Sequence, residues 1–135
     1  MKKQQRKFAL VISGIMVALI SCQPEHTGNI DVRDDFAGNW LCHENSSLLP
    51  PSNYSVTITK STTDSSKIFI SNIYNLGSSQ KAFAVVNGHS LNLPSQTVNN
   101  LSISGGGTLA GSTITLNFTA YDGNNTDNVT ATLTH

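Results

Sequence analysis

Apolar and polar residues alternate with a period of two in several short runs between residues 36 and 135. Such alternation predicts β-strands with one buried and one exposed face. The pattern is strongest over residues 113–120 and 129–134, where every second residue is Thr or Asn. No run shows ten residues of helical period. The expected strands lie at residues 36–42, 54–59, 67–74, 81–86, 91–93, 101–103, 113–120 and 129–134.

Short loops separate these runs. Asn87-Gly88, Gly111-Ser112 and Asp122–Asn125 supply residues that tolerate positive φ in tight hairpins. Gly105–Gly107 interrupts a run, which predicts a bulge or a sharp bend. Short loops favour antiparallel up-and-down pairing, because parallel pairing needs crossovers of a dozen or more residues. About eight strands close a small barrel without free edges. The sequence therefore predicts an all-β, eight-stranded antiparallel barrel, with a β-sandwich as the alternative.

The last two strands are expected to form a hairpin whose inward residues share one interior. Those residues are Ile114, Leu116 and Phe118 on one strand and Val129, Ala131 and Leu133 on the other. Tyr54 and Phe118 lie on apolar faces, so we expect them in the core. The alternative is a ligand cup lined by some of the aromatic residues.

The first 22 residues are typical of a secretory leader. Four basic residues lie within the first seven, and residues 8–20 form an apolar run shorter than the ~17–25 residues of a membrane-spanning helix. Leu19-Ile20-Ser21-Cys22 follows and resembles the bacterial lipobox. The resemblance implies a signal peptide at residues 1–21, diacylglycerol on the Cys22 sulfur, and an acyl chain such as palmitate on the new amine. The alternative is an ordinary cleaved signal with an incidental Cys.

Residues 22–35 are polar and acidic, with a Pro and a Gly near their start, so we expect an acidic flexible tether before a domain at residues 36–135. Gln23, not Asp, follows Cys22, which in enterobacterial lipoproteins implies the outer membrane. We therefore expect a lipid-anchored protein of the bacterial cell envelope. If Cys22 carries lipid, Cys42 has no disulfide partner and is expected as a small buried hydrophobe. The alternatives are a reactive thiol or an intermolecular disulfide.

Zero net charge is an average over two unlike parts. Residues 22–135 hold four basic and eight acidic side chains, so their net charge is 4 − 8 = −4. A mildly acidic chain lacks the clustered Lys and Arg that nucleic acids require, which excludes that class of partner. Leu, Ile, Val and Phe make up 27 of these 114 residues, roughly 24%, above the ~20% typical of disorder. The mature chain can therefore form one modest core.

Gly38-Asn39-Trp40 opens the first expected strand. It resembles the Gly-X-Trp signature of lipocalins and related calycin barrels, and the whole arrangement is similar to small lipocalin-like lipoproteins of Bacteroidota. The resemblance implies that Trp40 packs across the closed end of the barrel and that Gly38 lets the incoming chain pass close to it. Lipocalins often stack an Arg from the last strand on this Trp. No Arg follows Arg33 here, so the barrel floor must close differently.

Most candidate catalytic and metal-binding motifs in the sequence do not have the geometry that such sites need. Cys42-His43-Glu44 looks like a metal or nucleophile cluster, but neighbours on a strand point to opposite faces. We therefore expect polar surface or half-buried residues there. No nucleophile motif or phosphate loop exists in the chain, and the remaining carboxylates have nothing to fix their spacing. The sequence predicts no catalytic residue, metal site or cofactor, and no enzyme.

Asp122–Asn128 holds several oxygen-bearing side chains that could surround calcium. It lacks the Gly and Glu of an EF-hand loop, so a polar hairpin turn is the preferred interpretation.

Two function classes remain. The first is a membrane-tethered, non-enzymatic binding module for a small apolar ligand, a glycan or a partner protein, whose ligand-binding residues the sequence does not name. The second is a structural or protein-interaction lipoprotein, or an inhibitor, with a filled core. An open apolar cup of ~300 Å3 or more would favour the first, and a packed interior the second.

Overall fold

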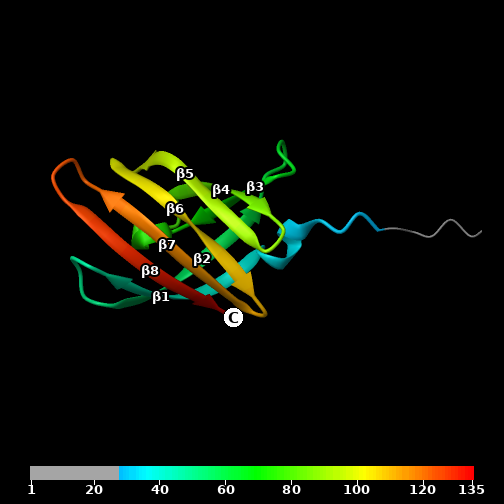
Figure 1. The fold of residues 1–135 in the computed structure, drawn as a ribbon, viewed down its shortest axis with the longest axis horizontal. Helices are drawn as coiled ribbons and strands as arrows, with labels where there is room; N and C mark the ends of the chain where they lie inside the picture. The colour runs from blue at the N-terminus through cyan, green and yellow to red at the C-terminus, as the bar shows by residue number, and fades with distance from the viewer. Residues whose placement is uncertain (1–27) are drawn as a thin grey trace, which may run out of the picture.

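Eight strands form where the alternation predicts them, and each pairs antiparallel with its neighbour along the chain (Figure 1). The last strand closes on the first, so the sheet is a barrel and not a sandwich. The computed structural model describes residues 28–135. The strands are β1 (Gly38–Ser46), β2 (Ser52–Lys60), β3 (Lys67–Ser71), β4 (Lys81–Asn87), β5 (Ser90–Val98), β6 (Leu101–Ala110), β7 (Thr113–Tyr121) and β8 (Thr126–Thr134).

The predicted terminal hairpin is confirmed. The loop at residues 122–125 joins β7 to β8, and the register sets Leu116 opposite Ala131 and Phe118 opposite Val129. These side chains are buried, whereas Thr115 belongs to the outer face. The alternation in the sequence therefore gives the correct inward set for both strands.

Strand β3 ends earlier than its apolar run predicts. Asn72 turns into the left-handed region with φ +65°, which Asn tolerates better than most residues. Its side chain holds the turn: Nδ2 donates to the Ser55 carbonyl at 2.8 Å, and Oδ1 accepts from the Gly77 amide at 2.8 Å. The short 3₁₀ helix η2 (Ile73–Asn75) follows in place of the expected strand end.

Strand β5 runs longer than expected, through Pro94. Its register with β6 shifts between Leu93 and Gln96, as at a bulge, where a Pro is tolerated. The Gln96 side chain then bridges to β4, because its Oε1 accepts from the Phe83 amide and its Nε2 donates to the Phe83 carbonyl, both at 2.8 Å. An amide side chain therefore supplies contacts that a backbone ladder supplies elsewhere.

The triple glycine lies inside β6 and does not end it. A Cβ at Gly105 would overlap the Asn117 carbonyl oxygen and the Phe118 backbone, and one at Gly107 would lie 2.7 Å from the Leu116 side chain. Glycine is therefore required where β6 passes close to the backbone of β7. The expected sharp bend takes the form of this close approach within a continuous strand.

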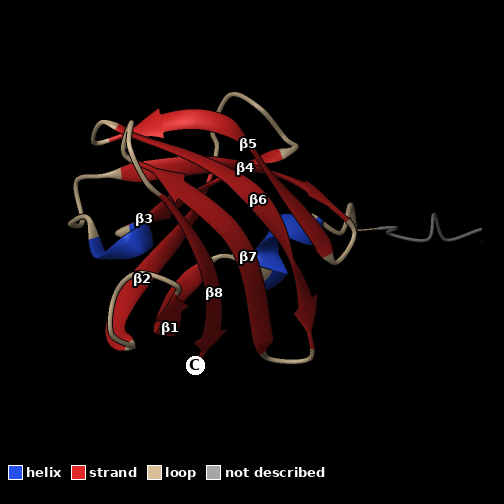
Figure 2. Ribbon diagram, turned by 60° about the vertical axis from the view of Figure 1, so that its left-hand side comes forward, coloured by secondary structure: helices blue, strands red, loops and turns tan. Residues whose placement is uncertain are grey.

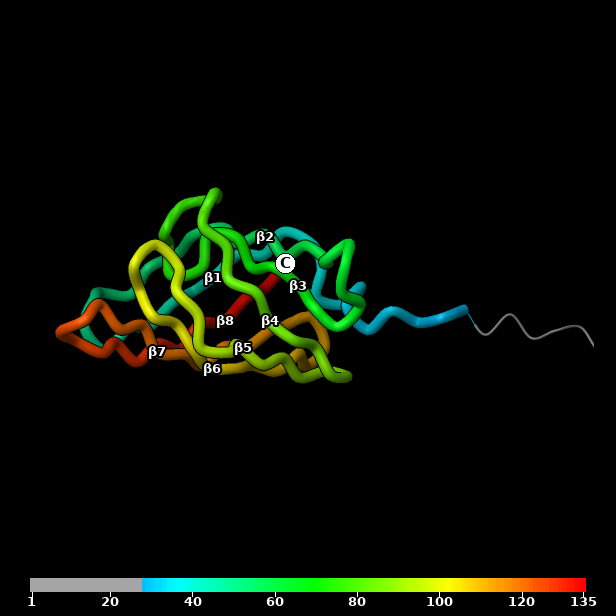
Figure 3. The backbone as a smooth tube through the Cα atoms, turned by 90° about the horizontal axis from the view of Figure 1, so that it is seen from above, coloured from blue at the N-terminus to red at the C-terminus, as the bar shows by residue number. Residues whose placement is uncertain are grey.

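Side chains of all eight strands fill the barrel interior with one apolar cluster. Both ends are covered as well (Figure 2). The 3₁₀ helix η1 (Val32–Asp35) and Phe36 lie at one end, here called the floor. Ile73, Tyr74 and Leu76 pack against the core from η2 and its flank at the other, here called the distal end. The loops after β1, β5 and β7 surround the distal end, away from the point where the chain enters (Figure 3).

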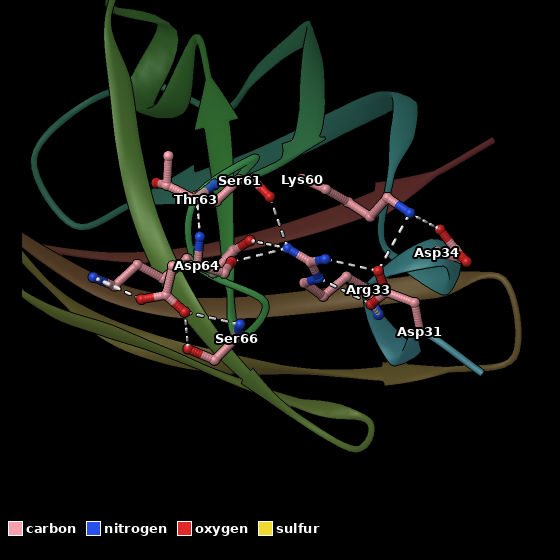
Figure 4. Close-up of polar contacts among 9 residues, drawn as sticks. Asp31, Arg33, Asp34, Lys60, Ser61, Thr63, Asp64 and Ser66 are labelled. Atoms are coloured by element: carbon pink, nitrogen blue, oxygen red, sulfur yellow. Dashed lines mark hydrogen bonds and ion pairs between the residues drawn. The ribbon is translucent and has the colours of Figure 1, made fainter. Parts of the chain in front are cut away.

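The end of the expected tether belongs to the folded domain, which corrects the predicted boundary at residue 36. Asp31 caps η1, and Arg33 is 8% exposed. The Arg33 guanidinium forms a two-bonded pair with Asp31, with Nε–Oδ1 at 2.9 Å and Nη2–Oδ2 at 2.7 Å (Figure 4). Its Nη1 donates to the carbonyls of Ser61, Asp64 and Lys67 at 3.0–3.2 Å. Arg33 therefore fastens η1 to the β2–β3 loop.

The predicted signal peptide at residues 1–21, the lipidation site Cys22 and the first part of the tether lie outside the described residues. They remain predictions from the sequence.

Candidate binding surface

The barrel interior is packed with side chains and does not form the ligand cup that was the alternative to a core. Tyr54 and Phe118, expected in the core, point into the barrel and pack against its apolar cluster. Tyr74 meets Phe118 edge to face, with ring centroids 6.3 Å apart. Side chains occupy the volume that an apolar ligand would need, so the interior is a core.

Trp40 and Gly38 lie at the floor, at the start of β1 and beside Phe36. Trp40 is 2% exposed, and its Nε1 donates to the Phe36 carbonyl at 2.8 Å. Gly38 has φ +141°, a conformation that L side chains rarely adopt. The aromatic partner of Trp40 is His135, whose ring centroid lies 3.8 Å away. His135, directly after β8, thus packs on the Trp40 ring with an interplanar angle of 32°.

A surface hollow of about 720 Å3 lies beside this floor. Trp40 and His135 line it together with Asp35, His89 and the β6–β7 turn. Trp40 contributes little surface to it, because the residue is almost fully buried. The hollow lies at the same end of the barrel as η1, since Asp35 of that helix is among its lining residues.

Two carboxylates are buried inside the distal end, which corrects the expectation that Glu44 is a surface or half-buried residue. Glu44 is 4% and Asp127 2% exposed. The Tyr54 hydroxyl donates to Glu44. Burial raises the pKa of Glu44, the Tyr54 hydrogen bond opposes that rise, and the negative charge of Asp127 adds to it. Burial and the bond to Glu44 also raise the pKa of Tyr54.

Asp127 anchors the β1–β2 loop. It accepts hydrogen bonds from the Ser46 hydroxyl, from the Ser47 amide at 2.8 Å, and from the Tyr74 hydroxyl at 2.7 Å. Burial alone would raise the pKa of Asp127, but these hydrogen bonds outweigh it and lower the pKa. The loop they hold carries Leu48 and Leu49, both more than half exposed. Asp127 is thus a structural carboxylate that positions an apolar loop.

The two carboxylates predict opposite pH effects on stability. The pKa of Glu44 is raised on folding, so its stabilising contribution is complete below the unfolded pKa of ~4.3 and is lost as pH rises through the folded pKa. Glu44→Gln keeps an acceptor for Tyr54 without the charge and is expected to raise the melting temperature at pH 7, but not at pH 3.5.

Asp127→Asn is the matched control. The pKa of Asp127 is lowered, so its contribution is present above ~3.9 and lost as pH falls through the folded pKa. We expect this variant to melt lower than the parent at pH 7, with the difference shrinking in acid. Thermal melts of both variants from pH 3 to 8 check the pair. A lower melting temperature for Glu44→Gln at pH 7 would contradict the assignment.

Cys42 is a buried free thiol, as predicted. Burial is the main cause that raises the pKa of Cys42 to about 11, and the nearby Glu44 carboxylate adds to it. His43 points outward and contacts Asn53 across the strand at 2.7 Å. Within residues 28–135, no three His, Cys, Asp or Glu side chains form a group that could hold a metal ion. The Cys-His-Glu sequence is therefore split between two faces.

The loop at residues 122–125 is a turn in which the Asp122 side chain accepts hydrogen bonds from backbone amides of the same loop. Asp122 Oδ1 accepts from the amides of Asn124 at 2.8 Å and Asn125 at 2.7 Å. These bonds lower the pKa of Asp122. The geometry fits the preferred interpretation, a polar hairpin turn.

A shallow hollow of about 450 Å3 lies on the outside of the barrel, across β6, β7 and β8. Polar side chains of all three strands surround it, and Gly105, which has no side chain, lies among them. The Thr130 hydroxyl donates to Asn117 Oδ1 at 3.0 Å, and the hydroxyls of Ser104 and Thr119 lie 3.3 Å apart. The lining residues are Ser104, Gly105, Asn117, Phe118, Thr119, Asn128, Val129 and Thr130.

Sequence reasoning placed Glu44 and Asp127 at strand ends or in loops and did not identify this outer hollow. Strand parity signals the first two, because Glu44 has the parity of Trp40 and Cys42, and Asp127 that of Val129 and Leu133. No comparable signal exists for the hollow, because its lining residues come from three strands that only the pairing of the sheet brings side by side.

No protein-family model matches the chain, and no curated protein matches it. Among solved structures it is similar to a redesigned β-barrel, with a TM-score of 0.59 and 14% sequence identity. The match covers 79% of this chain and 96% of that one. At this identity the likeness shows the fold alone, an eight-stranded antiparallel barrel. Within residues 28–135, no helix is long and apolar enough to cross a membrane.

Proposed function

We propose that this protein is a lipocalin-like lipoprotein of the bacterial cell envelope, anchored through Cys22 to the outer membrane. Its barrel is a non-enzymatic binding module that engages its ligand on the outer surface and not in the interior. The observation that carries this proposal is the filled, end-capped barrel beside a polar hollow on β6–β8. A filled interior withdraws support from a small apolar ligand held inside the barrel.

The chain length between anchor and domain supports this arrangement. Asp31 is the ninth residue after Cys22, and nine residues span at most ~32 Å. The floor, where the chain enters, would therefore lie nearest the bilayer. The distal end and the outer strand faces would stay accessible.

The packed core also favours a purely structural or protein-interaction role, including that of an inhibitor. Leu48 and Leu49, exposed on a loop that Asp127 fixes, favour a protein partner in that case. The hollow on β6–β8 favours ligand binding instead, because its volume of about 450 Å3 lies in the range of small-molecule sites.

Cys22→Ser tests the anchor. The variant cannot form the thioether, so we expect it to stay uncleaved or to be released from membranes, whereas Cys42→Ser should fractionate like the parent. A processed, membrane-bound Cys22→Ser protein would overturn the anchor.

Native mass spectrometry of the gently extracted protein tests where a ligand lies. We expect no retained apolar small molecule. A co-purifying apolar ligand that survives washing and is lost on unfolding would place the site inside the barrel and contradict the outer-surface proposal.

A further inference from the structure

We infer that the outer surface of β6, β7 and β8 binds an uncharged carbohydrate. This inference rests on the proposed function, because it names the ligand class of that same outer site. The surface in question is the hollow of about 450 Å3 together with the outward side chains around it.

The first argument is charge. Each of the three strands presents five outward positions, and none of the fifteen (5 × 3) is Lys, Arg, Asp or Glu. A soluble surface ordinarily carries roughly 25–35% charged residues. A charge-free face fits a ligand without charge, since neither side then has to shed the water around an ion. The outward residues are Ser102, Ser104, Gly106, Thr108, Ala110, Thr113, Thr115, Asn117, Thr119, Tyr121, Thr126, Asn128, Thr130, Thr132 and Thr134.

The second argument is hydrogen-bonding chemistry. Hydroxyls and amides both donate and accept, as do the hydroxyls of a sugar. Asn117, Asn128 and the hydroxyl residues around the hollow therefore match a neutral polyol group for group. Cross-strand hydrogen bonds hold two pairs of these side chains in place, Thr130 with Asn117 and Ser104 with Thr119. These side chains therefore lose less conformational entropy when a ligand binds.

The third argument is an aromatic ring at the edge of the face. Tyr121 is 43% exposed on the outer side of β7, between Ser102 of β6 and Thr126 of β8. Its hydroxyl donates to the Gly123 carbonyl at 2.6 Å, which fixes the ring on the surface. An exposed, fixed aromatic ring offers an apolar face to the C–H side of a sugar ring, next to a polar hollow that meets its hydroxyls.

Barrel closure argues against the commonest alternative for a β surface. A peptide that adds a strand needs a free edge, and β6, β7 and β8 each pair with a neighbouring strand on both sides. Recognition on this face must therefore come from side chains. The hollow is also of the size that small-molecule sites have.

The test is affinity electrophoresis of the full-length, detergent-solubilised protein through gels that contain one polysaccharide each. The neutral probes are laminarin, mannan, dextran and xyloglucan, and the anionic probes are alginate and polygalacturonate. We expect at least one neutral polysaccharide to retard the protein and the anionic ones to leave its mobility unchanged. If no neutral polysaccharide retards the protein, or if an anionic one retards it more, the inference is wrong.

The chain supplies a matched pair of variants that localises the site. Asn117→Ala removes an amide beside the hollow, and Asn39→Ala removes the amide of the equivalent Thr–Asn pair on β1 and β2, where Thr57 donates at 2.9 Å. We expect Asn117→Ala to weaken retardation about tenfold, the usual effect of one or two lost hydrogen bonds, and Asn39→Ala to leave it unchanged. Equal losses in both variants, or no loss in either, would overturn the site.

The two proposals fail in different ways. An apolar ligand retained in native mass spectrometry would refute the outer-surface function itself. Absence of polysaccharide binding with an empty native spectrum would refute the carbohydrate while leaving that function in place.

Discussion

Leu116→Asp is expected to unfold the domain, whereas Thr115→Asp, one residue away, should cost well under ~1 kcal/mol. Leu116 is 2% exposed and faces the core opposite Ala131 and Gly107. An aspartate there loses its water and finds no positive partner, a penalty of several kcal/mol per ion. Total stability of a domain this size is only ~5–15 kcal/mol. Thr115 belongs to the outer face, where a carboxylate keeps its hydration.

Thermal melts of the two variants, followed by circular dichroism at pH 7, make this comparison. Leu116→Ala provides a graded third variant, expected to lose ~2–5 kcal/mol, in case the aspartate variant does not accumulate. If Leu116 and Thr115 prove equally tolerant, or if Thr115 is the more sensitive position, the register of the β7–β8 hairpin is wrong. Every inward assignment that follows from the same parity would then be wrong as well.

Trp40→Ala is expected to lower the free energy of unfolding by ~3–5 kcal/mol, the usual cost of deleting a large buried aromatic residue. The ring is the largest side chain of the floor and is bonded to the Phe36 carbonyl. Its removal leaves a void between η1 and the core, which η1 cannot fill because Arg33 fastens it to the β2–β3 loop. Urea unfolding of the parent and the variant measures the difference.

His135→Ala separates the stacking contact from the burial of Trp40. It deletes the ring that covers Trp40 but leaves the core intact, so we expect a loss of only ~0.5–1.5 kcal/mol. A Trp40→Ala loss below about 1 kcal/mol would place the ring at the surface, in the hollow beside the floor, and would make it a binding residue.

Much of the fold follows from local pattern. Period-two alternation located most of the eight strands, since a half-buried strand must present its apolar residues on one side, and β3 was located by a short run that is apolar on both faces. Predictions failed where the chain departs from that period: Asn72 ends β3 with a left-handed residue, and the bulge near Pro94 extends β5 past the point where its pattern fades. At both places an amide side chain bonds to backbone in another segment. The spacing of apolar residues in the sequence does not predict such hydrogen bonds.

The candidate site was far less predictable than the fold. Parity places Glu44 and Asp127 inside, but their polar character argued for the surface. That argument was wrong, because Tyr54, Tyr74, Ser46 and Ser47 meet their hydrogen-bonding needs across the barrel end. Each of these partners lies on another segment of the chain, whose position depends on how the strands pair in the barrel.

The sequence by itself determined the approximate position of the eight strands, the hairpin turns at Asn87-Gly88, Gly111-Ser112 and Asp122–Asn125, and the inward sets of β7 and β8, since these depend on residues within a few positions of one another. It also predicted the free, buried Cys42 and the buried Trp40. Only the tertiary structure decided between a barrel and a sandwich, showed that the interior is filled, placed Arg33 on carbonyls 28 to 34 positions away, and brought β6, β7 and β8 together around a hollow. The physical reason is the sequence separation of the interacting groups. Alternation between neighbouring residues determines which face of a strand a side chain lies on, but strand pairing across the sheet determines which distant groups it contacts there.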